Sequence, residues 1–69
     1  MMFYVYILRS KKDNDFYIGC TSDLKKRLNE HNLGKSKSTA SRIPFVLVYY
    51  EAYINKEDAF TREQYLKTG

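Results

Sequence analysis

A single cysteine, Cys20, in a chain of 69 residues leaves no route to an internal disulfide or to a zinc site built on cysteines. A domain of this length buries only about 60% of the surface of its unfolded chain, so its stability must come from one small core. The length also excludes a second domain. We therefore expect one domain over residues 1–69, held together by packing and hydrogen bonds alone.

The expected location follows from the same cysteine and from the N-terminus. A lone thiol is kept reduced most easily in the cytosol. The N-terminal stretch MMFYVYILRSKKDN has too short an apolar part for a membrane span, and it lacks the small-residue cleavage site of a signal peptide. We expect a cytoplasmic protein that does not enter the membrane.

Three runs of β-branched and aromatic residues predict the strands of a sheet. Residues 3–9 (FYVYILR) and 15–19 (DFYIG) read as two strands joined by a polar hairpin loop. Residues 44–54 (PFVLVYYEAYI) give the strongest strand pattern, with the proline at its start, where a missing N–H is tolerated. The hairpin is apolar or aromatic on both faces, which favours a sheet covered on both sides.

Two helices are predicted between and after these strands. The first follows Ser22 or Asp23 as its N-cap and ends near Gly34, and the second begins after Asn55. The stretch KSKSTASRI between the first helix and the last strand reads as a loop with room for a short helical turn. The order is β-β-α-β-α, so we expect an α/β (α+β) fold with a three-stranded mixed sheet flanked by helices.

Both helices carry charged residues on the side expected to face the core. In the first helix, Leu24, Leu28, Arg27 and His31 share an arc of about 100°. In the second, Glu63 lies in the middle of the apolar stripe, where an unpaired carboxylate costs several kcal/mol. One interpretation is a buried Glu63–Arg27 ion pair with His31 as a satisfied polar neighbour. The other is a reactive site in a cleft.

Charge and tyrosine content leave further alternatives open. The chain has a net charge of +4 and seven tyrosines, of which the hairpin can bring Tyr6 and Tyr17 together on one face. The segment from residue 25 to residue 42 is strongly basic with one acid, Glu30, which suits either a solvated surface or a polyanion partner. The basic candidates for nucleic-acid binding are Lys25, Lys26, Lys35, Lys37, Arg42 and, on the last helix, Lys67.

These residues resemble a known family pattern. YVYIL at 4–8 and FYIGCTSDLKKRLNEH at 16–31 resemble the two signature segments of the GIY-YIG endonuclease family. PFVLVYYEAYINKEDAFTREQYLK at 44–67 is similar to that family's third strand and glutamate-bearing helix. The resemblance spans nearly the whole chain. Within the family it is strongest to the small stand-alone bacterial branch and to the catalytic subunits of structure-specific junction nucleases.

The resemblance implies roles for five side chains. Tyr6 and Tyr17 correspond to the tyrosines of the two motifs, Arg27 to the catalytic arginine, and His31 to an auxiliary histidine of some branches. Glu63 corresponds to the single metal-binding carboxylate. The implied activity is hydrolysis of DNA phosphodiester bonds, in branched or damaged DNA, with one divalent cation, Mg²⁺ or Mn²⁺.

The chemistry of these residue types agrees with that implication. Mg²⁺ is commonly held through only one or two carboxylates, so Glu63 can suffice. Arg27 offers planar donors that match phosphate oxygens. The general base that activates the attacking water is expected to be Tyr6, because neighbouring positive charge favours its phenolate. The alternative base is His31.

Two other functions remain as alternatives at this point. One is a non-catalytic nucleic-acid-binding module of the same fold, whose affinity would depend on salt. The other is a protein-interaction domain. Since the sequence contains no separate DNA-recognition module, we expect a protein partner or a homodimer to supply substrate specificity. In close relatives a basic stretch follows a segment like YLKTG, so the end at Gly69 is read as either a truncation or a short natural form.

Overall fold

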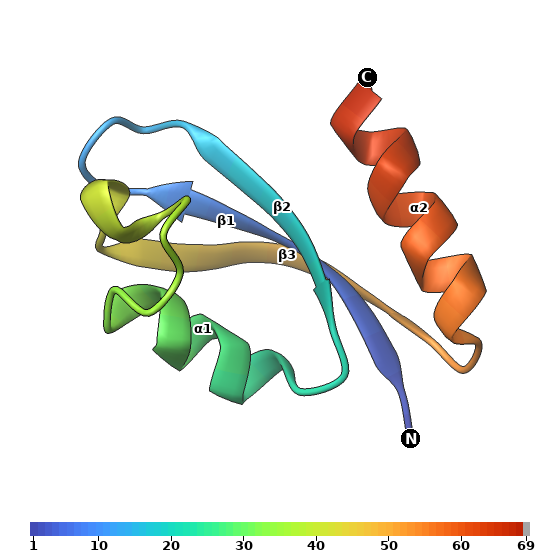
Figure 1. Ribbon diagram of the computed structural model, residues 1–69. Coiled ribbons are helices and arrows are strands. Elements are labelled where there is room, and N and C mark those ends of the chain that lie inside the picture. The colour runs from blue at the N-terminus through green and yellow to red at the C-terminus, as the bar shows by residue number, and fades with distance from the viewer. Residues whose placement is uncertain (69) are drawn as a thin grey trace.

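The computed structural model describes residues 1–68, and Gly69 lies outside the described residues. Its strands are β1 (Phe3–Ser10), β2 (Phe16–Thr21) and β3 (Phe45–Tyr53). Its helices are α1 (Leu24–Asn32), a short 3₁₀ turn, η1 (Ala40–Arg42), and α2 (Lys56–Thr68). The predicted β-β-α-β-α order is confirmed, and the fold is α+β. Figure 1 shows α1 and α2 on opposite sides of the sheet, as the apolar character of both hairpin faces indicated.

The sheet is antiparallel throughout, so the prediction of a mixed sheet was wrong. The strand order is β2-β1-β3, and both β2 and β3 run antiparallel to β1. A helical connection such as α1 returns the chain in the direction of the preceding strand, which makes β2 and β3 parallel to each other. They are not neighbours, however, because β1 lies between them.

The register of the hairpin decides which side chains share a face. Tyr6 stands opposite Gly19 and Leu8 stands opposite Tyr17. Successive side chains of a strand point to opposite faces, so these four residues lie on the face that α1 covers. Val5, opposite Cys20, points to the other face, toward α2.

Both helices begin with the side-chain caps expected from the sequence. The carboxylate of Asp23 accepts a hydrogen bond from the Lys26 backbone N–H (3.1 Å), so Asp23 is the N-cap of α1. The side-chain oxygen of Asn55 accepts bonds from the backbone N–H groups of Glu57 (2.8 Å) and Asp58 (3.3 Å). Gly34, just past the end of α1, has φ 76°, the left-handed conformation that glycine adopts without a steric penalty.

The apolar core is small and lies under α1. It is formed by Tyr6, Leu8 and Phe45, with Leu24, Leu28 and other half-buried residues packed around it. On the opposite face Val5 is buried, and of the described residues of α2 itself only Ala59 and Glu63 are buried. The fold therefore devotes part of its limited buried volume to polar side chains, and these residues define the candidate site.

Candidate active site

A buried chain of polar contacts runs from β1 through α1 to the loop before η1. The hydroxyl of Tyr6 lies 3.0 Å from Nε2 of His31, and Nδ1 of His31 lies 2.8 Å from Oγ1 of Thr39. Thr39 donates its own proton to the backbone carbonyl of Ser36 (3.4 Å). Its oxygen is then free to accept from Nδ1–H, which leaves the lone pair of Nε2 to accept from Tyr6. All three linked side chains are buried.

Tyr17 completes an aromatic cluster around the histidine. Its ring centroid lies 5.0 Å from that of His31 and 6.5 Å from that of Tyr6. Phe45 also packs against this cluster, with its ring centroid 6.1 Å from that of His31 and 6.5 Å from that of Tyr17. The structure thus brings together Tyr6, Tyr17 and His31, and packing holds the rings in place.

Gly19 makes room for the Tyr6 hydroxyl. A Cβ atom at position 19 would collide with the hydroxyl oxygen and the adjacent ring carbons of Tyr6. The ring of Tyr6 therefore lies directly over the backbone of β2, and its hydroxyl comes close to the free edge of the sheet. This contact gives a steric reason for the glycine of the second motif.

Burial controls the protonation of this pair. Burial raises the pKa of Tyr6 to about 12, although the interaction of its hydroxyl with Arg27 acts in the opposite direction. Burial also lowers the pKa of His31 below its ordinary value, and the positive charge of Arg27 adds to that effect. At neutral pH the stable state is consequently a protonated tyrosine that donates to a neutral histidine.

Arg27 is half-exposed beside this pair. Its guanidinium forms an ion pair with Glu30 one turn along the same helix (3.3 Å). Glu63 instead pairs with Lys67 on α2 (3.1 Å). The structure thus does not form the buried Glu63–Arg27 ion pair that was one interpretation of the sequence.

Glu63 lies on the opposite face of the sheet from Tyr6. The residue is only 7% exposed and lines a pocket of about 450 Å³ with Cys20, Thr21 and Ser22. No hydrogen bond links Glu63 to the Tyr6–His31 pair in the described chain. Its negative charge still reaches the Tyr6 hydroxyl, where it adds to the rise of the pKa that burial causes.

The donors around Glu63 fit a hard divalent cation. No group of three His, Cys, Asp or Glu side chains gathers anywhere in residues 1–68, and Glu63 is the one carboxylate among the described residues that line this pocket. Mg²⁺ accepts such a site, because water and substrate phosphate complete its shell. Thr21 and Ser22, which carry hydroxyls, line the same pocket, as does the positively charged Lys56. Burial raises the pKa of Cys20, which keeps it a thiol and so a poor metal ligand.

The basic candidates divide into two groups. Lys25, Lys26, Lys35 and Lys37 are exposed. Arg42 is engaged with Asp13 (2.9 Å) and lies over the ring of Phe45, and Lys67 is engaged with Glu63.

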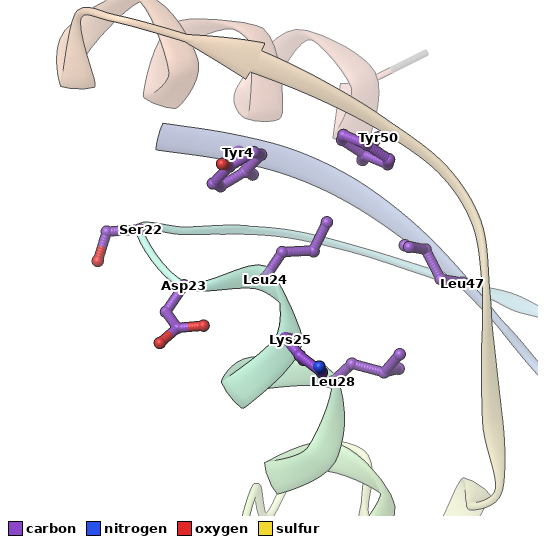
Figure 2. A pocket seen from close by; sticks show the side chains of 8 residues that line it. All are labelled: Tyr4, Ser22, Asp23, Leu24, Lys25, Leu28, Leu47 and Tyr50. Atoms are coloured by element: carbon purple, nitrogen blue, oxygen red, sulfur yellow. The ribbon is translucent and has the colours of Figure 1, made fainter. Parts of the chain in front are cut away.

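A second pocket, of about 460 Å³, lies apart from these residues. Figure 2 shows it between the first half of α1 and the sheet, with the rings of Tyr4 and Tyr50 above Leu24 and Leu28. Of the sequence-predicted site residues, only Lys25 lines it. It therefore reflects incomplete cover of the sheet by a helix of nine residues.

Sequence reasoning missed Thr39, the partner of His31. Thr39 belongs to a polar stretch that reads as loop, and no spacing in it distinguishes a buried threonine from an exposed one. The reason for Gly19 was also missed. A strand glycine opposite a tyrosine is a signal for close approach, and it becomes useful only once the hairpin register is known.

No helix within residues 1–68 has the length and apolar character needed to cross a bilayer.

The fold and the site together define a nuclease domain of the GIY-YIG type. Its features are the antiparallel β2-β1-β3 sheet, the two motif tyrosines, the arginine on α1 and the glutamate on α2. A family model described as the GIY-YIG catalytic domain matches residues 2–68, and the chain belongs to this family of nucleases.

The relatives within that family are small bacterial proteins. The chain is 48% identical over 67 residues to UPF0213 protein CPE1444 of Clostridium perfringens, covering 96% of this chain and 71% of that protein. It is 46% identical over 66 residues to UPF0213 protein SH2523 of Staphylococcus haemolyticus, covering 94% and 79%. The solution NMR structure of UPF0213 protein BH0048 from Bacillus halodurans matches with a TM-score of 0.63 and 41% identity, covering 100% of this chain and 73% of that one.

Proposed function

We propose that this protein is a metal-dependent endonuclease that hydrolyses DNA phosphodiester bonds, in branched or damaged DNA. The observation that carries the proposal is the Tyr6–His31 hydrogen bond beside Arg27, in a chain of the GIY-YIG family. The protein would act in the cytoplasm, with a protein partner or a second copy of the chain selecting the substrate.

In the proposed reaction Tyr6 and His31 act together as the base, which joins the two alternatives that the sequence left open. A phenolate is disfavoured because burial raises the pKa of Tyr6 to about 12. Tyr6 can still accept a proton from water if it passes its own proton to Nε2 of His31 in the same step. The hydroxide attacks phosphorus, the P–O bond on the opposite side breaks, and solvent protonates the leaving oxygen.

The remaining candidates bind and stabilise the substrate. Arg27 donates to the phosphate oxygens on which negative charge develops, while Tyr17 holds the imidazole of His31 by ring packing. Glu63 would hold the Mg²⁺ or Mn²⁺ ion, which when bound supplies Lewis-acid polarisation of the phosphate. The DNA backbone would contact the basic side chains Lys25, Lys26, Lys35, Lys37, Arg42 and Lys67.

The test is cleavage of labelled linear, nicked, flapped and four-way DNA in Mg²⁺ or Mn²⁺. Wild-type protein should cut in a metal-dependent way, and Glu63→Gln should not. Glu57→Gln makes the same charge change at an exposed position of α2 and should cut normally. Intact DNA together with salt-sensitive gel retardation would contradict the nuclease and support a non-catalytic binding module of the same fold.

A further inference from the structure

The carboxylate of Glu51 on β3 is held by four hydrogen bonds. Oε1 accepts from the Tyr53 hydroxyl (2.7 Å) and Nε of Arg62 (3.0 Å). Oε2 accepts from the Tyr49 hydroxyl (2.6 Å) and Nη2 of Arg62 (3.1 Å). The two tyrosines stand two residues to either side, on the same face of the strand. Glu51 is thus a fixed anion, and two nitrogens of one guanidinium, Nε and Nη2 of Arg62, donate to it.

Arg62 precedes Glu63 in α2, so the anchored residue and the candidate metal ligand are adjacent on one rigid helix. Other constraints on this helix are few. Of the apolar residues of α2, Ala59 is buried, Leu66 is half-buried, and Phe60 and Tyr65 are 57% and 66% exposed. The ion pair of Glu63 with Lys67 lies within α2 and cannot fix the helix to the sheet. The bonds from Arg62 to Glu51 therefore fix the rotation of α2 against β3.

We propose that Glu51 is a positioning residue, which through Arg62 turns Glu63 into its pocket beside Cys20. This inference rests on the proposed function, since it assigns a purpose to the orientation of Glu63. Figure 1 shows that α2 follows β3 through a short turn, which holds only the start of the helix, whereas Arg62 lies at the middle of α2. Without the anchor, only Ala59 and Leu66 pack apolar side chains of α2 inward, and we expect the helix to shift enough for the carboxylate to leave the pocket.

Mn²⁺ binding without DNA provides the test. Titration of Mn²⁺ into the full chain, followed by paramagnetic broadening of the amide signals of Cys20 and residue 63, gives the dissociation constant. Glu51→Gln should raise that constant by about tenfold, in the range found for residues that orient metal ligands. Glu57→Gln should not change it. In Glu51→Gln, the rate of DNA cleavage at saturating Mn²⁺ should fall much less than the affinity for Mn²⁺.

The outcomes separate this inference from the proposed function. A Glu51→Gln protein that is folded by circular dichroism and binds Mn²⁺ like the wild type overturns the positioning role and leaves the nuclease standing. Absence of Glu63-dependent broadening in the wild type overturns the metal site and this inference with it. If Glu51→Gln does not fold, Arg62→Lys replaces it, because lysine keeps the charge but cannot donate the two parallel hydrogen bonds of a guanidinium. A tenfold loss of Mn²⁺ affinity in Arg62→Lys supports the positioning role, and an unchanged affinity overturns it.

Discussion

The hydroxyl of Tyr6 and Nε2 of His31 lie 3.0 Å apart in the interior, joining β1 to α1. A chain of 69 residues has little interior to spare, and a Phe–Leu contact at this place would stabilise the fold at least as well. The pair is instead connected onward to Thr39 and supported by Tyr17. The proton transfer that we propose would account for a polar arrangement at this place in the core.

Replacing Tyr6 by phenylalanine separates the chemical role of its hydroxyl from its packing. Tyr6→Phe keeps the ring but leaves Nε2 of His31 buried without a partner, which should lower the free energy of unfolding by about 1–3 kcal/mol. Cleavage of DNA should fall by a factor of about 10² to 10⁴, the usual contribution of a general base. Tyr65→Phe, at an exposed position, is the control. A Tyr6→Phe enzyme with normal turnover would show that another group is the base.

Gly19→Ala tests whether the space over β2 is needed. The added methyl group would collide with the Tyr6 hydroxyl and push the ring away from His31. We expect a loss of stability of about 1–3 kcal/mol, as for other overpacked sites, together with loss of cleavage. Urea unfolding and the cleavage assay measure the two effects. Gly34→Ala is a useful contrast, because there the penalty comes from backbone conformation and Tyr6 is untouched. Full activity in Gly19→Ala would contradict the role given to the close approach.

The buried histidine predicts a pH dependence of stability. Burial and the charge of Arg27 lower the pKa of His31 in the folded state below 6.5. Between the folded and the unfolded pKa the unfolded chain binds a proton that the folded chain does not. The free energy of unfolding should therefore fall as pH is lowered through about 6.5, by at most about 1.4 kcal/mol per pH unit. Denaturant titrations from about pH 5 to 8 check this in wild type and His31→Gln. Equal slopes in the two proteins would assign the effect to other groups.

The exposed lysines after α1 should determine the salt dependence of DNA binding. Each phosphate contact contributes about 0.9 to the slope of log affinity against log salt. If Lys35 and Lys37 each contact one phosphate, the double alanine variant should lower that slope by about 1.8 without changing the metal requirement. Arg42→Ala should lower the slope less, because Arg42 is already paired with Asp13. Fluorescence anisotropy at several salt concentrations gives the slopes, and an unchanged slope in the double variant would remove both lysines from the interface.

Much of the fold follows from local sequence signals. The alternating runs located the strands to within about two residues, the usual precision of such boundaries. The caps at Asp23 and Asn55 placed the starts of both helices. The strand order could not be predicted from these local signals. The central position of β1 between β2 and β3 depends on tertiary packing, which no local sequence pattern encodes.

The sequence predicted which residues belong to the candidate site, but it did not predict how they are arranged in space. Placing Arg27 and His31 on the inward stripe of α1 was possible because both belong to one helix. The separation of Glu63 from them depends on which face α2 covers, and helical periodicity gives no information about that. Thr39 and Glu51 form hydrogen bonds to residues on other elements, His31 and Arg62, and such partners are visible only in three dimensions.

The position of β2 at the margin of the sheet has a consequence for assembly. Tyr6 reaches this margin over Gly19 from one side, while Glu63 lies in a pocket with Cys20 on the other. In the proposed site a phosphodiester must consequently straddle the outer strand. A dimer that extended the sheet by pairing β2 with another strand would block that path. With the proposed site, an active dimer would therefore join through a different surface and leave the outer edge of β2 open to solvent.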